Sequence, residues 1–407
     1  MKRSVLKWTS HTVLIVGVIF TLAVVAFYFS PLSTISPLAS NVQVYESTSQ
    51  VAAPIMVPQG LVVTHLKTPE PLKAIYMSSW VAGNEKLRDA LVKFMDESEI
   101  NAVVIDIKDY TGKISFEVEN PKLKEYNSVE RRIPDVKEFI DTLHKKNIYV
   151  IGRISSFQDS YLVKTHPQYA VKDKAGAVWK DRKGVSWLDA GAKPVWDYLD
   201  LIGDEAYSVG FDELNFDYIR FPSDGDMVDI AYPFSQGKVK SEVMREFFAH
   251  VGDTFRPKKI PVSADLFGMT TSNKDDLGIG QILENALAHF DYVAPMVYPS
   301  HYPANFDGMK NPSAEPYNLI KFVMTKGAER AVLASTTPAK LRPWLQDFSI
   351  NGTHYTPEMV RAQITATNDI GLTSWMMWNA SNRYSESAYL AALGALTSTT
   401  SPQTLHN

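Results

Sequence analysis

The sequence predicts an α/β protein built as one (β/α)₈ barrel, a TIM-barrel architecture, preceded by an apolar N-terminal segment. Short apolar runs typical of buried strands alternate with amphipathic helical stretches, and eight such pairs can be counted. Turns from helix to strand are short, whereas connections after strands are long. A barrel takes about 250 residues or more, so 407 residues leave room for appendages. A doubly wound open sheet is the competing architecture, but the first strand lacks a glycine-rich turn after it.

Each expected strand is a short apolar run bounded by polar or turn-forming residues. The eight strands are expected at residues 74–80, 102–108, 148–154, 213–221, 261–267, 292–298, 331–335 and 373–378. The clearest helices, with apolar residues recurring every three or four positions, are residues 85–97, 136–146, 239–255 and 357–369. The long connections after strands are residues 155–193, 222–238, 299–316 and 336–356. In a barrel this elaborated end carries the active site.

The N-terminal segment has the pattern of a membrane anchor. Lys2, Arg3 and Lys7 precede an apolar run over residues 12–29, and the next charged side chain is Glu46. The run nearly spans the roughly 30 Å hydrocarbon core, and its basic flank places residues 1–11 in the cytoplasm. A cleaved signal peptide is the alternative, but its best cleavage motif is poor. We therefore expect a single-pass protein of the cell membrane with its C-terminal domain outside the cytoplasm.

The rest of the chain divides by composition into three parts. Residues 30–71 are rich in Ser, Thr, Pro and Val with few charges, which is typical of an extended linker. The strand and helix alternation occupies residues 72–395. The Ser- and Thr-rich residues 396–407 are expected to form a flexible tail.

Composition excludes several chemistries. The chain has no cysteine, which excludes disulfides, thiolate metal sites and cysteine nucleophiles. It has no paired-histidine motif of a metallohydrolase, no P-loop and no G-x-S-x-G elbow, so neither a metal nor a cofactor is expected. The net charge is −4, and the three basic residues before the apolar run leave −7 for the remainder. Nucleic acid is therefore not expected as a partner.

Two carboxyl groups on neighbouring strands are the expected catalytic residues. Alternation places Glu213, Asn215 and Asp217 on one face of the fourth strand, and Asp265 on one face of the fifth. Asp217 and Asp265 would then share one rim, with Asp217 as nucleophile or base and Asp265 as general acid. Each Asp could instead cap a helix or pair with an arginine. Glu213 is expected in a core ion pair and Asp212 at the surface.

Polar and aromatic residues near the same strand ends are the expected substrate contacts. Charged side chains there could bind sugar hydroxyls or shift a neighbouring pKa, and each could equally be structural. Aromatic rings could stack on sugar faces, with Trp80 and Trp179 as further candidates. The expected substrate-binding residues are Asp106, Lys108, Asp109, Arg153, Trp187, Arg220, Met296, Tyr298 and Trp378.

Three motifs resemble a bacterial family of TIM-barrel proteins assigned to the glycoside hydrolases by similarity. They are NAVVIDIKDYTG at 101–112, FDELNFDYIRFP at 211–222 and APMVYP at 294–299. The resemblance covers about residues 72–395 and implies a barrel with carbohydrate chemistry. Members of the family are commonly secreted or membrane-anchored. A strand-four Asp followed by a strand-five carboxylate is also similar to the α-amylase clan, where the second acid is usually Glu, so Asp265 departs from that pattern.

Together these features predict a membrane-anchored extracytoplasmic glycoside hydrolase. Its expected partners are a cell-envelope or external polysaccharide or oligosaccharide, and the membrane through the N-terminal helix. The alternative is a non-catalytic carbohydrate-binding or envelope scaffold protein that uses the same barrel cleft without turnover.

Overall fold

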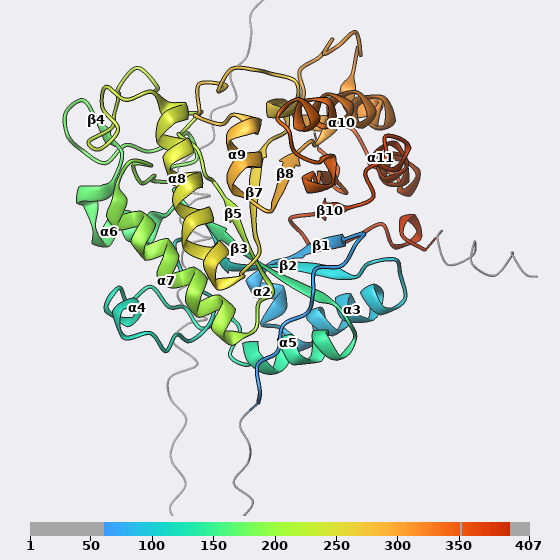
Figure 1. Ribbon diagram of the computed structural model, residues 1–407, viewed down its shortest axis with the longest axis horizontal. Coiled ribbons are helices and arrows are strands. Elements are labelled where there is room, and N and C mark those ends of the chain that lie inside the picture. Colours follow the sequence, from blue (N-terminus) through green and yellow to red (C-terminus); the bar gives the residue numbers. More distant parts are fainter. Residues whose placement is uncertain (1–60, 351, 391–407) are drawn as a thin grey trace, which may run out of the picture. The chain divides into compact units, whose positions relative to one another are not determined.

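The computed structural model describes residues 61–350 and 352–390, and within them eight parallel strands close into a barrel (Figure 1). Neighbouring strands follow the order β1-β10-β9-β8-β7-β5-β3-β2, which confirms the predicted (β/α)₈ architecture. The barrel strands are β1 (Lys73–Met77), β2 (Ala102–Lys108), β3 (Tyr149–Ser155), β5 (Glu213–Asp217), β7 (Val262–Phe267), β8 (Tyr292–Met296), β9 (Trp344–Gln346) and β10 (Trp375–Trp378). A separate antiparallel pair, β4 (Lys172–Asp173) and β6 (Ile230–Ala231), joins two of the long loops.

Helices follow the strands and surround the barrel (Figure 1). The longer helices are α3 (Glu85–Asp96), α5 (Val136–Lys145), α7 (Lys193–Val209), α8 (Lys240–Phe255), α9 (Leu283–His289), α10 (Pro316–Leu333) and α11 (Pro357–Asp369). Short helices α2 (Ser79–Ala82), α4 (Pro121–Glu125) and α6 (Ser160–Thr165) lie in the loops after strands. Single 3₁₀ turns cover Pro167–Tyr169, Arg256–Lys258, Gly268–Thr271, Pro299–His301, Pro312–Ala314, Pro338–Lys340 and Glu386–Ala388.

Local sequence explains where several helices begin. The Asn84 side chain accepts a hydrogen bond from the Leu87 N–H at the start of α3. Thr356 caps α11 in the same way, and Pro357 fills the first helical position, where no N–H donor is needed. These caps explain why the predicted starts of both helices match the observed ones.

The prediction of a seventh strand at residues 331–335 is wrong. Residues 331–333 form the last turn of α10, and the true strand is β9, inside the stretch predicted to be a loop. Val332 and Leu333 are 60% and 83% exposed, so their apolar run is a helix end rather than a buried strand. β9 is only three residues long and directly follows Pro343, which hid it from an apolar-run criterion. After β10, the described residues contain a 3₁₀ turn where the eighth helix was expected.

The core has two parts, one on each side of the barrel wall. One cluster fills the space between strands and helices, and it explains why every residue of β2 and β3 is buried. The other fills the barrel interior, where Ala74, Val104, Ile151 and Met376 pack together. Polar side chains lie below and above this inner apolar layer.

A buried ion pair closes the amino-terminal end of the barrel. Arg342 Nη1 lies 2.9 Å from Glu213 Oε2, and both side chains are almost completely buried. The Tyr149 hydroxyl donates a hydrogen bond to the same Glu213 oxygen at 3.2 Å, and the Arg342 guanidinium lies over the Tyr292 ring. The predicted core role of Glu213 is therefore confirmed.

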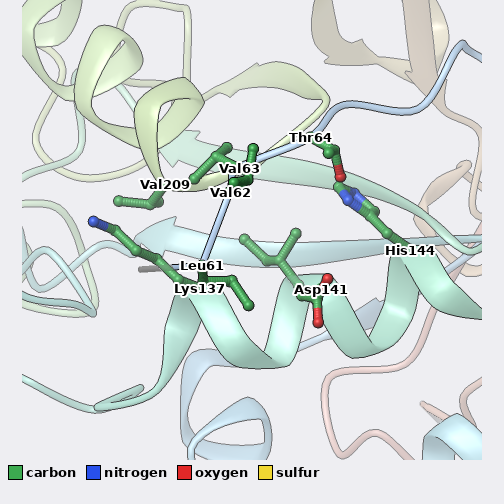
Figure 2. Close-up of a pocket in the computed structure, with 10 residues that line it drawn as sticks. Leu61, Val62, Val63, Thr64, Lys137, Asp141, His144 and Val209 are labelled. Carbon is green, nitrogen blue, oxygen red and sulfur yellow. The ribbon is translucent and has the colours of Figure 1, made fainter. Parts of the chain in front are cut away.

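Asp212, expected at the surface, is buried. Its carboxylate accepts hydrogen bonds from the backbone N–H groups of Leu66 (2.7 Å) and Val150 (2.8 Å) and lies 2.9 Å from His144 Nε2. Asp212 is buried because residues 61–71, expected to belong to the linker, lie against the barrel and cover the start of β5. Figure 2 shows Leu61 to Thr64 beside α5 and Val209, around a hollow of about 10 Å³. That volume is about one water molecule.

Among the described residues, no helix is both long and apolar enough to cross a bilayer. The expected anchor at residues 12–29, most of the expected linker and the expected tail at 396–407 lie outside the described residues.

Replacing Arg342 by Met is expected to lower the free energy of unfolding by about 3–5 kcal/mol, because the Glu213 charge stays buried without a partner. Chemical denaturation followed by circular dichroism measures this change. The double variant Arg342→Met/Glu213→Leu should recover most of the loss, since an apolar pair replaces the ion pair. A single variant as stable as the wild type would contradict the assigned role.

Candidate active site

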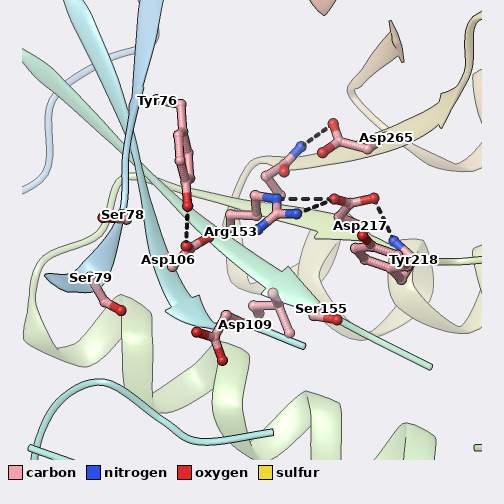
Figure 3. Close-up of polar contacts among 12 residues, drawn as sticks. Tyr76, Ser78, Ser79, Asp106, Asp109, Arg153, Ser155, Asp217, Tyr218 and Asp265 are labelled. Atoms are coloured by element: carbon pink, nitrogen blue, oxygen red, sulfur yellow. Dashed lines mark hydrogen bonds and ion pairs between the residues drawn. The ribbon is translucent and has the colours of Figure 1, made fainter. Parts of the chain in front are cut away.

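Arg153 links three neighbouring strands at the carboxyl-terminal end of the barrel (Figure 3). From β3, its Nη1 donates to Asp106 Oδ1 on β2 at 2.6 Å. Its Nε and Nη2 donate to Asp217 Oδ2 on β5 at 3.0 and 2.5 Å. The three side chains are buried, so this is an ion-pair network inside the barrel rather than on its surface.

Asp217 is fixed through both of its carboxylate oxygens. Oδ2 is bound by Arg153, and Oδ1 accepts a hydrogen bond from the Tyr218 N–H at 2.6 Å. Tyr218 has φ +52°, a left-handed conformation that non-glycine residues rarely adopt and that is typical of functional sites. This turn ends β5 at Asp217, four residues before the predicted end of the strand, and it aims the N–H at the carboxylate. Oδ2 already accepts two hydrogen bonds from Arg153, whereas Oδ1 accepts one and keeps a further lone pair for a substrate or water.

Asp265 has a different environment although it lies near Asp217. Its Oδ1 accepts hydrogen bonds from Asn215 Nδ2 (2.9 Å) and Trp344 Nε1 (2.8 Å), both uncharged donors. Burial and the negative charge of Asp217 raise the pKa of the Asp265 carboxyl well above its usual range. Because Oδ1 accepts both bonds, the retained proton belongs on Oδ2.

Asp106 is the third carboxyl group of the cluster. It accepts a hydrogen bond from the Tyr76 hydroxyl at 2.5 Å as well as from Arg153. Burial raises the pKa of Asp106 and that of Tyr76. The Tyr76 ring stacks on Trp378 at 4.0 Å, and the Arg153 guanidinium lies 5.1 Å from the Trp378 ring centre. Trp378 therefore borders the charged cluster directly.

Met296, at the end of β8, and Tyr298, two residues later, border the cluster. Burial and the negative charge of Asp217 raise the pKa of the Tyr298 hydroxyl, so it stays a neutral hydrogen-bond donor. Both side chains pack with Tyr76, Trp344 and Trp378 in the inner cluster.

Residues 74–384 match the model of a family described as "Putative glycosyl hydrolase domain". The chain belongs to this family. The match confirms the resemblance inferred from the three motifs and covers the barrel. No curated protein sequence matches the chain significantly.

Solved structures with a similar fold include glycoside hydrolases. The glycoside hydrolase domain of PgaB (BpsB) from Bordetella bronchiseptica is 14% identical, with a TM-score of 0.57, covering 80% of this chain and 98% of that one. A hypothetical protein from Ruminiclostridium thermocellum ATCC 27405 is 34% identical, with a TM-score of 0.42, covering 50% of this chain and 98% of that one. The α-galactosidase TtGalA from Thermus thermophilus is 13% identical, with a TM-score of 0.47, covering 82% and 62%. The PgaB comparison supports the fold alone.

In this glycosyl hydrolase family member, six of the expected site residues lie together around Arg153 or at its border. They are Asp106, Asp217, Asp265, Met296, Tyr298 and Trp378. Arg220 lies beside them, with its guanidinium 5.6 Å from the Tyr218 ring centre.

Three expected substrate contacts are engaged by the protein itself. Lys108 Nζ lies 2.7 Å from Asp159 with both side chains fully buried, because a bulge in the register between Asp106 and Lys108 interrupts the alternation. Asp109 is paired with Arg132 at 2.7 Å. Trp187 is 0% exposed, so its ring has no free face for a sugar. At all three positions the functional group is therefore already paired with, or covered by, the protein.

Several site residues were not predicted from the sequence. Tyr76 could have been found, because alternation from Ala74 places it on the inner face of β1. Trp344 could not, since its strand was assigned to a loop. Tyr218 depends on a left-handed turn that no neighbouring glycine or asparagine announces.

One group of three potential metal ligands exists in residues 61–350 and 352–390, at Asp197, Asp200 and His250. These residues lie on α7 and α8, outside the barrel wall, where His250 Nε2 is 2.8 Å from Asp200 Oδ2. A single hydrogen bond between packed helices accounts for this grouping.

The Asp265→Asn variant should become more stable relative to the wild type as the pH rises. A carboxyl group in an unfolded chain has a pKa of about 3.9, whereas folded Asp265 holds its proton to higher pH. The wild type therefore loses up to about 1.4 kcal/mol of unfolding free energy per pH unit above about pH 4, and the neutral Asn does not. Denaturation of both proteins across this range measures the difference. A difference that is independent of pH would contradict the neutral carboxyl.

Proposed function

We propose that this protein is a glycoside hydrolase acting on a cell-envelope or external polysaccharide. The observation that supports this best is the contrast between two nearby carboxyl groups. Asp217 is ion-paired with Arg153, whereas Asp265 contacts only neutral donors and has a raised pKa. One ionised and one protonated carboxyl group are what acid/base cleavage of a glycosidic bond requires.

Each residue then has a definite role. Asp265 donates the proton on Oδ2 to the glycosidic oxygen as the bond to the anomeric carbon breaks. Asp217 acts either as the nucleophile at that carbon or as the base that deprotonates an attacking water. Arg153 is ion-paired with Asp217 and holds its carboxylate in a fixed orientation. Trp378 offers a ring face to the sugar, and the Tyr298 hydroxyl donates a hydrogen bond near the reacting atoms.

The remaining expected site residues divide by burial. Asp106 and Arg153 hold the catalytic carboxylate, and Met296 borders the sugar site. Lys108, Asp109 and Trp187 are positioning residues, because the protein already occupies their functional groups. No step requires a metal or a cofactor.

We also propose the location of this activity. Residues 12–29 anchor the chain in the cell membrane as a single span, and the barrel lies outside the cytoplasm. The support is the sequence pattern of basic residues followed by an uninterrupted apolar run. Residues up to about 60 then act as a tether that lets the barrel reach a polysaccharide.

Amide substitutions test the catalytic assignment. Asp217→Asn and Asp265→Asn should each lower the release of reducing ends from a susceptible glycan by about 10²–10⁴-fold, because each removes one proton-transfer or nucleophilic group. The assay uses the full chain in detergent against a panel of cell-envelope and plant polysaccharides. Asp89→Asn, at an exposed position of α3, is the matched control and should keep wild-type activity.

The pH profile separates the two roles. The wild-type rate should fall at high pH as Asp265 loses its proton, at a pH above the usual carboxyl range.

Full activity in both the Asp217→Asn and Asp265→Asn variants would refute the catalytic assignment. Saturable glycan binding without any release of reducing ends would favour the carbohydrate-binding alternative instead.

Deletion of residues 1–29 tests the anchor. The full chain should remain with membranes after alkaline carbonate washing, whereas the truncated chain should be released, because about 18 apolar residues supply the membrane affinity. In intact cells or spheroplasts, external protease should cleave the barrel of the full chain. Protection from protease, or release of the full chain by carbonate, would contradict the proposed location.

A further inference from the structure

Arg220 differs from the buried lysines and arginines among the described residues because it has no carboxylate partner. Within the part of the chain that the structure describes, no carboxylate oxygen lies within ion-pair distance of its guanidinium. The five buried lysines and arginines of the described residues each have such a partner: Lys108 with Asp159, Arg132 with Asp109, Arg153 with Asp217, Arg330 with Glu284 and Arg342 with Glu213. A charge that the protein itself leaves uncompensated is a candidate for pairing with a ligand.

The position of Arg220 suits such a ligand. Its guanidinium is held between the rings of Trp187 (4.7 Å) and Phe267 (4.6 Å), close to Tyr218, which follows Asp217. Nη1 donates to the Phe221 carbonyl and to Ser223 Oγ. Nε and Nη2 have no acceptor among the described residues, and the side chain is only partly buried. Two donors of a rigid fork therefore remain available beside the catalytic pair.

Negative groups around Arg220 do not replace a ligand. Asp217, Asp224 and Asp181 are near enough to influence it electrostatically, but none forms an ion pair with it. Asp217 is bound by Arg153, and the Asp181 carboxylate accepts hydrogen bonds from the Trp187 indole and from backbone N–H groups.

The long loop that contains Trp187, residues 155–193, carries further cations that have no carboxylate partner among the described residues. A groove of about 390 Å³ is bordered by Lys164 and Lys180, and Arg182 and Lys183 follow directly. All four side chains are exposed, and no described carboxylate lies within ion-pair distance of any of them. The rest of the groove is lined by Ser160, Val163, Pro167, Val178, Gly184 and Ser186. Figure 1 shows this region, with β4 and α6, at one edge of the barrel.

The groove connects to the catalytic residues through the same aromatic contacts. Ser186 lines the groove and precedes Trp187, whose ring lies edge-on to Tyr218 at 5.8 Å. Asp159, Asp181 and Asp189 of this loop are buried while its cations face solvent, although the chain after Lys7 has a net charge of −7. This local reversal of charge lies beside the proposed cleavage site.

We propose that the polysaccharide recognised by this site is acidic, with Arg220 binding a carboxylate, sulfate or phosphate group of a sugar beside the catalytic pair and the Lys164–Lys180 groove binding the acidic chain beyond it. The inference rests on the proposed function in taking the barrel rim as a glycan site. It assigns Arg220 as a specificity-determining residue.

Binding to one backbone with different charges tests this inference. The full chain in detergent is titrated with dextran, carboxymethyl-dextran and dextran sulfate, which distinguish neutral, carboxylate and sulfate groups. Binding to at least one charged polymer should exceed binding to dextran by about tenfold or more at low salt, and the difference should shrink with added salt. Arg220→Gln should remove about tenfold of the charged-polymer affinity, and Arg220→Lys should keep part of it.

Controls separate recognition from general charge and from folding. Arg245→Gln, on the exposed face of α8, makes the same charge change and should leave all affinities within about twofold. If Arg220→Gln does not fold, Lys164→Gln/Lys180→Gln at exposed positions should weaken charged-polymer binding instead. Equal binding of neutral and charged polymers, an Arg220→Gln effect no larger than that of Arg245→Gln, or equally tight binding of single-stranded DNA would overturn the inference.

The two proposals fail in different ways. Selective binding of charged polymers without cleavage of any glycan would refute hydrolysis and leave acidic recognition standing. Cleavage of a neutral glycan that Arg220→Gln leaves unchanged would refute acidic recognition and leave hydrolysis standing.

Discussion

Arg153 brings a full positive charge into the barrel, and the carboxyl-terminal end of the interior is arranged to compensate it. Removing an ion from water costs several kcal/mol unless partners replace its hydration. Here Asp106 and Asp217 contribute from the strands on either side, and Tyr76 completes the hydrogen bonding of Asp106. Arg153 donates two hydrogen bonds to Asp217 and one to Asp106, so its positive charge acts mainly on Asp217. Asp265 receives only amide and indole donors, so its ionisation would put a second negative charge beside Asp217 in a buried site.

The interior therefore has charged layers at both ends of an apolar middle. Glu213 and Arg342 form the lower layer and bind Tyr149, while Arg153 and its carboxylates form the upper one. The apolar side chains between them keep the two networks apart. The lower pair stabilises the barrel, in agreement with the general division of barrels into a stability end and a catalytic end. Partly exposed groups such as Arg220 and Trp378 occur at the upper end.

Much of this could be predicted from sequence because strand periodicity is a local property. β2 and α11 have the predicted bounds, and alternation placed Asp217 and Asp265 on inner faces of neighbouring strands. The failures each have a non-local cause. β9 is too short to stand out from its loop, and a bulge turns Lys108 away from the interior. Trp187 was read as a rim ring, but the long loop folds over it. The alternation along a strand predicts which face of the sheet a side chain lies on. Whether that side chain is buried depends on which loops fold over it.

The central claim is that the two carboxyl groups differ in charge at neutral pH. Carbon-13 NMR of protein labelled at the aspartate side-chain carboxyl carbon measures this directly, with Asp265→Asn and Asp217→Asn identifying the two resonances. The account predicts that near pH 7 the Asp265 carbon has the chemical shift of a protonated carboxyl group and the Asp217 carbon that of a carboxylate. Two carboxylates that titrate together in the ordinary range, or a protonated Asp217 beside an ionised Asp265, would contradict it.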